Sequence, residues 1–187
     1  MLVYRVFPYL PSAAPGQPGH PCYLHPSAGG GRLDNPARYS VWYLSYDACG
    51  AIGEVFGNQQ TWSDAMFGYP ALPGSRRALA TFTLPDDLPI LDLDDAHTLL
   101  VRGLRPTHVV ERNRAVTQAW ALRVYEERDD RGQSKWQGVK WWSFHRPQWR
   151  LLGYWGSTLP ANVHVEQLHA KHYAVLDAAN TLCKPII

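Results

Sequence analysis

Apolar runs and period-two alternation predict a series of strands along this chain. Leu2–Phe7 alternates between apolar and polar positions, and Val41–Ser45 is a continuous apolar run typical of a buried strand. Four later segments have the same character: Arg77–Leu84, Leu88–Leu93, Val139–Phe144 and Leu151–Trp155. Because Pro89 lacks a backbone N–H, the strand over residues 88–93 is expected near a sheet edge or at a strand start.

Apolar positions three and four residues apart predict helices between these strands. Asp47 is a suitable N-cap for a helix that carries Ala48, Ala51, Ile52, Val55 and Phe56 at helical spacing. Further helices are predicted over Asp94–Leu100 and Arg114–Glu127. The apolar positions between Ala161 and Ala179 predict a C-terminal helical tail over about residues 161–183.

The order of these elements favours an α+β fold, since strands and helices alternate without a regular βαβ rhythm. A Pro/Gly-rich stretch over residues 8–31 interrupts the pattern and is expected to be irregular. So long a loop is often functional, as a lid or a partner contact, although a surface insertion would have the same composition. No repeat or composition shift marks a boundary, so residues 1–187 are expected to form one domain.

Composition narrows the function classes. Hydrophobic residues make up 45% of the chain and charged residues 18%, which is typical of a globular protein. The net charge of +2 and the lack of a long basic block argue against a nucleic-acid surface. Cys22, Cys49 and Cys183 form no C-x-x-C pair, no signal pattern opens the chain, and no apolar run is long enough for a membrane span. We therefore expect a soluble, cytoplasmic protein with no membrane contact.

Two segments carry candidate chemistry. Gly29-Gly30-Gly31 precedes Arg32, so backbone could approach a ligand closely beside a guanidinium, although a flexible turn with an exposed Arg has the same sequence. Glu54 lies away from the apolar stripe of its helix, between Gly50 and Gly57. A carboxylate on so bare a helix face could meet a flat ligand; the alternative is a surface Glu on a glycine-weakened helix.

Taken together, these motifs resemble the RES domain family. The resemblance rests on Tyr4-Arg-Val-Phe7, Gly30-Gly-Arg-Leu-Asp-Asn35, Trp42-Tyr-Leu-Ser45, Ala51-Ile-Gly-Glu54, Leu91-Asp-Leu-Asp94, Thr117-Gln118 and Gly138-Val-Lys-Trp-Trp-Ser143. It covers most of the sequence, less securely after residue 161. It identifies Arg32, Glu54 and Ser143 as catalytic residues.

The resemblance also implies that NAD⁺ is bound through Arg32 and Ser143, with Tyr43 as a further pocket residue and Arg5 as a helper. Tyr43 follows Arg32 by eleven positions and precedes Glu54 by eleven, which agrees with the family's spacing. The sequence departs from the family at Leu33, where an aromatic is usual, and at Pro36-Ala-Arg38, which replaces a Gly. His145 comes before Arg146 where an Arg is expected two residues after the Ser.

Members of this family resemble ADP-ribosyltransferase toxins, with mixed sheets and flanking helices around an NAD⁺ cleft. The resemblance implies a bacterial toxin that cleaves the nicotinamide–ribose bond of NAD⁺, its substrate, with no tightly bound cofactor. On this basis Glu54 would stabilise the developing ribosyl cation, Tyr43 would stack on nicotinamide, Arg32 and Arg5 would hold phosphate or ribose, and Ser143 would hydrogen-bond the ribose or a phosphate.

Several alternatives remain open at this point. The acceptor could be water, phosphate or a protein side chain, which would make the protein a glycohydrolase, a phosphorylase or an ADP-ribosyltransferase. A catalytically inactive RES-like module that binds a partner would fit the departures at Leu33 and His145. A toxin that acts on RNA is a further alternative, but this sequence lacks the basic stripe that RNA binding would need. No metal is expected, since His164, His169 and His172 lack the supporting acids or cysteines of most zinc sites.

A toxin of this kind needs restraint in its host. The resemblance implies a separate Xre-type helix-turn-helix antitoxin whose C-terminal end blocks the cleft, because this chain contains no such domain. It permits a homo-oligomer or a hetero-oligomer with the antitoxin. The stretch Pro8–Pro26 and the aromatic region Trp136–Trp149 are candidate contact surfaces for that partner.

Overall fold

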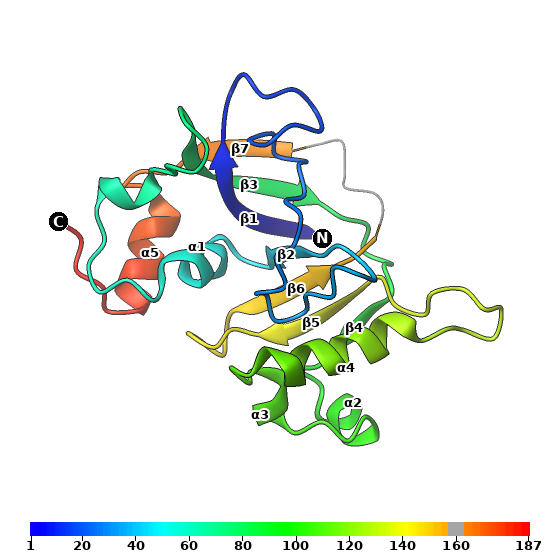
Figure 1. Ribbon diagram of the computed structural model, residues 1–187. Helices are drawn as coiled ribbons and strands as arrows, with labels where there is room; N and C mark the ends of the chain where they lie inside the picture. Colours follow the sequence, from blue (N-terminus) through cyan, green and yellow to red (C-terminus); the bar gives the residue numbers. More distant parts are fainter. Residues whose placement is uncertain (157–162) are drawn as a thin grey trace.

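In the computed structural model of this protein, which describes residues 1–156 and 163–187, strands and helices are mixed (Figure 1). The strands are β1 (Leu2–Tyr9), β2 (Trp42–Ser45), β3 (Arg76–Thr83), β4 (Ile90–Asp92), β5 (Gly138–Trp142), β6 (Arg150–Tyr154) and β7 (Val163–Gln167). The helices are α1 (Ala48–Phe56), a 3₁₀ turn (Asp64–Phe67), α2 (Ala96–Val101), α3 (Pro106–Val109), α4 (Arg114–Glu126) and α5 (Tyr173–Thr181). The predicted α+β class is confirmed.

The strands form one seven-stranded mixed sheet in the order β4-β5-β6-β2-β1-β3-β7. β4 runs parallel to β5, and the other neighbouring strands are antiparallel. The edge position of β4 confirms the expectation drawn from Pro89, which immediately precedes that strand.

The sheet divides into two leaves where β1 meets β2. β1 pairs with β3 from Leu2 to Tyr9, and β2 pairs with β6 from Trp42 to Ser45. In the described chain, the register between β1 and β2 is confined to Tyr4 and Ser45. The two leaves diverge from this point, as Figure 1 shows for β1 and β2. Pro8 is tolerated within β1 because β2 no longer runs beside that end of the strand.

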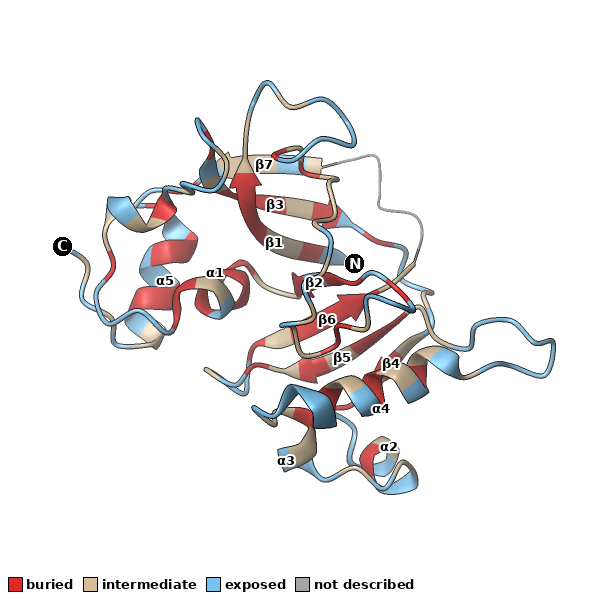
Figure 2. Cartoon of the chain, viewed as in Figure 1, coloured by how far each residue is buried: buried red, intermediate tan, exposed pale blue. Residues whose placement is uncertain are grey.

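Two apolar cores each cover one leaf, and a third core joins strands of both leaves through Phe7 and Phe82 on one and Trp42 and Leu152 on the other (Figure 2). α1 and α5 lie together, and Ile52, Phe56 and Val175 pack with Trp62 on the leaf that holds β1. α4 covers the other leaf, where Trp120 and its neighbours pack against β4, β5 and β6. Burying side chains of this size stabilises each leaf by about 1.5–3 kcal/mol per residue.

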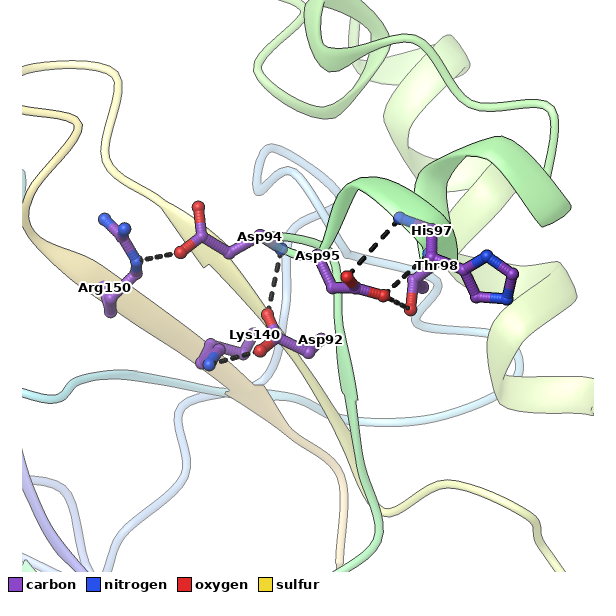
Figure 3. A network of polar contacts seen from close by, with 7 residues as sticks. All are labelled: Asp92, Asp94, Asp95, His97, Thr98, Lys140 and Arg150. Carbon is purple, nitrogen blue, oxygen red and sulfur yellow. Dashed lines mark hydrogen bonds and ion pairs between the residues drawn. The ribbon is translucent and has the colours of Figure 1, made fainter.

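Polar contacts fix the outer strands of the second leaf to one another (Figure 3). Lys140 on β5 forms an ion pair with Asp92 on β4 at 2.5 Å, and Arg150 on β6 pairs with Asp94 at 2.6 Å. Asp95 caps α2 by accepting hydrogen bonds from the backbone N–H and the hydroxyl of Thr98. Since these pairs are partly exposed, each contributes little to stability, and together they orient β5 as it leads to Ser143.

The predicted C-terminal helix is wrong in its first half. Residues 161 and 162 lie outside the described residues, and residues 163–167 form strand β7, which pairs with β3. Val163 and Val165 alternate with polar residues, which is the period of a strand. Pairing with β3 gives the backbone N–H and C=O groups of this segment hydrogen-bond partners in the neighbouring strand. His169 therefore shares no helix face with His172, which is instead the N-cap of α5.

Two short elements escaped the sequence analysis, the 3₁₀ turn and α3. Both are four residues long, too short for an apolar period to be recognised. No helix in residues 1–156 or 163–187 has the length and apolar character needed to cross a membrane.

The cap of α5 generates a stability prediction. His172 is 7% exposed, and its Nδ1 accepts a hydrogen bond from the backbone N–H of Ala174 at 3.3 Å. We expect His172→Ala to lower the free energy of unfolding by about 1–2 kcal/mol, because the helix loses its cap. His172→Asn, which keeps a capping acceptor, should lose less. Urea unfolding measures both; equal stability of His172→Ala and the original protein would contradict this role.

Candidate active site

A cavity of about 260 Å³ opens where the two leaves of the sheet diverge. Its walls come from β1, β2, β5, β6, α1 and the loop over residues 10–41. The polar and ionisable groups that line it are Tyr4, Arg5, His25, Ser27, Asp34, Tyr43, Ser45 and Glu54. Most of the remaining wall is aliphatic or aromatic, including Trp141 and Leu151. Ligand sites typically combine an apolar wall with a few placed polar groups, and this volume suits one end of a dinucleotide.

Glu54 projects into this cavity from α1, and Ser143 holds it there. The hydroxyl of Ser143 donates a hydrogen bond to Oε1 of Glu54. Ser143 has no exposed surface, and its Oγ accepts a hydrogen bond from the backbone N–H of His145 at 3.0 Å. The Ser143 hydroxyl thus uses its proton in the bond to Glu54 and a lone pair in the bond from His145, and these two bonds fix its orientation. Ser143 is not among the residues that line the cavity, so it meets the cavity through its contact with Glu54.

The glycines of α1 serve a purpose different from the one the sequence suggested. A Cβ at Gly53 would lie 2.1 Å from the indole ring of Trp149, and a Cβ at Gly57 would lie 2.8 Å from the imidazole of His145. The prediction of a bare helix face is therefore wrong, because side chains of the β5–β6 connection fill it. This close packing brings the backbone after Ser143 against α1, which makes the contact with Glu54 possible.

Tyr43 is fixed by its hydroxyl, while its ring faces the cavity. The hydroxyl donates to Oδ1 of Asp34 at 2.8 Å and accepts from the backbone N–H of Leu33 at 2.8 Å. Burial and the Asp34 carboxylate raise the pKa of Tyr43 far above its ordinary value, so it stays a neutral phenol. The side chain remains 38% exposed. An aromatic face held in place in this way is suited to stacking against a planar ring.

Asp34 is a residue that the sequence analysis missed. It is 6% exposed and accepts hydrogen bonds from Tyr43 and from the backbone N–H of Gly31, the latter at 2.6 Å. Gln118 on α4 adds further support, since its Nε2 donates to the carbonyl oxygens of Gly29 and Gly31. The glycine-rich segment is therefore a fixed turn. The signal in the sequence was an acid directly after Gly-Gly-Arg-Leu.

Arg32 is placed just outside the cavity. One guanidinium nitrogen donates to the carbonyl oxygens of Val109 and Glu111, both at 2.8 Å. Burial lowers the pKa of Arg32 and nearby Arg114 lowers it further, while Glu54 is close enough to oppose these effects. Arg32 thus ties the glycine-rich turn to the connection between α3 and α4, with its charge directed toward the site.

Arg5 lies inside the cavity on β1. Its guanidinium stacks over the ring of Trp42 at 4.7 Å and donates to the carbonyl oxygen of Tyr23 at 3.1 Å. Among the described residues it has no carboxylate in ion-pair distance. Burial lowers the pKa of Arg5 to about 10, with a small opposing effect from Cys22. A desolvated cation without an acidic partner is a natural binding point for an anion.

The predicted residues therefore meet at one place with different roles. Arg5, Tyr43 and Glu54 line the cavity, Ser143 is joined to it through Glu54, and Arg32 stands beside it. Sequence reasoning did not find the lining residues Leu24, His25 and Ser27, because nothing in the Pro-rich stretch distinguishes them from their neighbours. No cluster of three or more His, Cys, Asp or Glu side chains in residues 1–156 and 163–187 is arranged to hold a metal ion.

Two departures from the family pattern lie outside the cavity wall. Leu33 is fully buried and packs against Gly153 on β6, where a Cβ would come within 2.0 Å of its side chain. His145 packs against Gly57, and its backbone N–H supports Ser143. The first change therefore affects the core, and the second keeps the backbone contact that the site uses.

Comparisons with known proteins agree with this geometry. A family model for the RES domain matches residues 3–175, so the chain belongs to the RES domain family. A chain in the solved structure described as the M. tuberculosis MbcT–MbcA toxin–antitoxin complex is similar, with a TM-score of 0.61 and 18% identity over 98% of this chain and 89% of that chain. The two share a fold. A sequence search of curated proteins finds no match.

Packing at Gly53 generates a prediction for the site. An added methyl group there would meet the ring of Trp149, so we expect Gly53→Ala to lower stability by about 1–3 kcal/mol. This outcome opposes helix propensity, which alone favours Ala by about 1 kcal/mol. Gly68→Ala is the control, because its nearest neighbour would lie at an unstrained 3.4 Å. Thermal unfolding measures the stability of both variants. A Gly53→Ala variant that is more stable than the original protein would show that the clash with Trp149 is relieved at little cost.

Proposed function

We propose that this protein cleaves the nicotinamide–ribose bond of NAD⁺ and acts as the toxin of a toxin–antitoxin pair in the cytoplasm. The observation that carries the proposal is a single cavity that contains a positioned carboxylate, a fixed aromatic face and an unpaired buried cation: Glu54, Tyr43 and Arg5. These are the groups needed for a ligand with a planar cationic ring, a ribose and phosphates. No metal or tightly bound cofactor is invoked.

The proposed substrate position follows from the chemistry of each wall. The nicotinamide ring stacks on Tyr43, and the adjacent ribose lies over Glu54 on α1. The first phosphate meets Arg5, whose charge is otherwise unpaired in the cavity. Since the cavity is small, the adenosine end extends out of it, on the side where Arg32 and Arg114 add positive charge.

Bond cleavage then depends on charge stabilisation by Glu54. As the C1′–N bond breaks, its electron pair leaves with neutral nicotinamide, and positive charge develops on the ribose. The carboxylate of Glu54, an exposed residue that Ser143 holds in place, stabilises this charge, because an anion fixed in position needs little reorganisation. The hydrogen bond from Ser143 holds the carboxylate in one orientation, so Ser143 acts through Glu54.

Two acceptors are compatible with this site, water and phosphate, which would make the enzyme a glycohydrolase or a phosphorylase. Transfer to a protein side chain is the second candidate activity. The small volume and the loop that lines the cavity favour a small acceptor over a protein segment. A non-catalytic binding role is disfavoured, because the positioning of Glu54 and Tyr43 would serve no purpose in such a module.

The toxin assignment is supported by family membership and by a similar chain that was solved within a toxin–antitoxin complex. We propose that the partner is a separate Xre-type helix-turn-helix antitoxin that covers the cavity. Direct nucleic-acid binding by this chain is not proposed. Co-expression with the protein encoded beside it would test the pairing, and growth arrest relieved by that protein alone is the expected result.

The role of Glu54 is tested by Glu54→Gln, which keeps the shape of the side chain and removes its charge. We expect kcat for nicotinamide release from NAD⁺ to fall about 10²–10³-fold, with an unchanged thermal midpoint. Glu126→Gln is the matched control, since that carboxylate is exposed on α4 and outside the cavity. Nicotinamide is quantified by chromatography, and a fully active Glu54→Gln would refute the assignment.

The role of Arg5 is tested by Arg5→Gln. Loss of a charge-assisted contact to phosphate should raise KM for NAD⁺ about 10–100-fold, corresponding to about 1.5–3 kcal/mol. Arg77→Gln is the control, because that guanidinium also stacks on an aromatic ring but lies on β3 outside the cavity. Steady-state kinetics measures KM for NAD⁺ in both variants. An unchanged KM in Arg5→Gln would show that phosphate binds elsewhere.

A further inference from the structure

His25 lines the candidate active site from the Pro-rich loop. It belongs to the Pro-rich loop and lines the cavity together with its neighbours Leu24 and Ser27, whereas Glu54 lines it from α1. The lining of the site thus includes a carboxylate from a helix and an imidazole from a loop. The cleavage step described above uses the carboxylate and leaves the imidazole without a role.

The position of His25 is fixed through its own loop. The imidazole packs edge-on against the ring of Tyr23, with 4.8 Å between ring centroids and an interplanar angle of 90°. The carbonyl oxygen of Tyr23 in turn accepts the hydrogen bond from Arg5 on β1. His25 is therefore tied to the same strand that supplies the phosphate-binding cation.

The chemical state of His25 suits a proton acceptor. Burial lowers its pKa, and the nearby charge of Arg5 lowers it further, so the ring is neutral at neutral pH. Within the described residues, neither ring nitrogen takes part in a hydrogen bond. The other titratable groups that line the cavity are Tyr4, Arg5, Asp34, Tyr43 and Glu54. The hydroxyl of Tyr43 donates a hydrogen bond to Asp34, and one carboxylate oxygen of Glu54 accepts a hydrogen bond from Ser143.

We propose that His25 is the general base that activates water as the acceptor for the ribosyl group. This inference rests on the proposed function and extends it to the second half of the reaction. The C1′–N bond to nicotinamide breaks with its electron pair leaving on nicotinamide, a C1′–O bond to water forms, and the water proton passes to a ring nitrogen of His25 and then to solvent. The products are nicotinamide, ADP-ribose and one proton.

This assignment selects among the acceptors. Water must lose a proton as it attacks, and a neutral imidazole accelerates such a step by about 10²-fold or more. A phosphate dianion already carries a nucleophilic oxygen and needs no base. The geometry therefore favours hydrolysis over phosphorolysis, with ADP-ribose as the product in the presence or absence of phosphate.

The test uses the full chain with NAD⁺ and compares His25→Ala with His97→Ala, a surface histidine on α2 outside the cavity. ADP-ribose formation is followed across pH, with and without added imidazole and with and without inorganic phosphate. For the original protein we expect a rate that falls as pH drops through the lowered pKa of His25, below the ordinary value of about 6.5. The rate falls in this direction because protonation of the His25 imidazole removes the nitrogen that would accept the proton from water.

In His25→Ala we expect kcat to fall about 10²-fold or more with little change in KM, the acid limb to disappear, and added imidazole to restore activity. A merely structural role would not produce rescue by imidazole. Activity within twofold of the original protein, an unchanged acid limb, or a strict requirement for phosphate would each overturn the inference while leaving NAD⁺ cleavage intact. Absence of nicotinamide release from the original protein would instead refute the proposed function, and this inference with it.

Discussion

The divergence of β1 from β2 is the constraint on which the site depends. These strands meet in register at Tyr4 and Ser45, while β1 is paired along its whole length with β3, and β2 with β6. A sheet that stayed continuous here would leave no volume between its leaves. α1 with Glu54 and the loop with His25 both line this opening.

Close packing between α1 and the β5–β6 connection converts this opening into a site with fixed geometry. Gly53 and Gly57 allow Trp149 and His145 to approach the helix backbone, and that approach brings the hydroxyl of Ser143 to Glu54. A helix weakened by glycine in isolation is thus stabilised by tertiary contact. The cost in helix propensity is about 1 kcal/mol per glycine, and it is offset by burial of an indole ring.

Much of the fold could be predicted from the sequence, because strands such as β2 and helices such as α1 carry strong apolar patterns. β7 was mistaken for helix, since the two spacings overlap over five residues and only pairing with β3 decides between them. Glu54, Tyr43 and Arg5 could be recognised from motifs. Asp34 had a signal, an acid within the glycine-rich motif, but its role became apparent only from its contacts with Gly31 and Tyr43, and His25 lies in a loop without a motif.

The account stands on the claim that the nicotinamide half of NAD⁺ occupies the cavity between the two leaves of the sheet. A crystal structure of the inactive Glu54→Gln variant with NAD⁺ tests this claim most directly. The account predicts a nicotinamide ring stacked on Tyr43, a phosphate oxygen within hydrogen-bond distance of Arg5, and the ribose C1′ between residue 54 and His25. A dinucleotide bound on another surface, with this cavity empty at saturating NAD⁺, would contradict it.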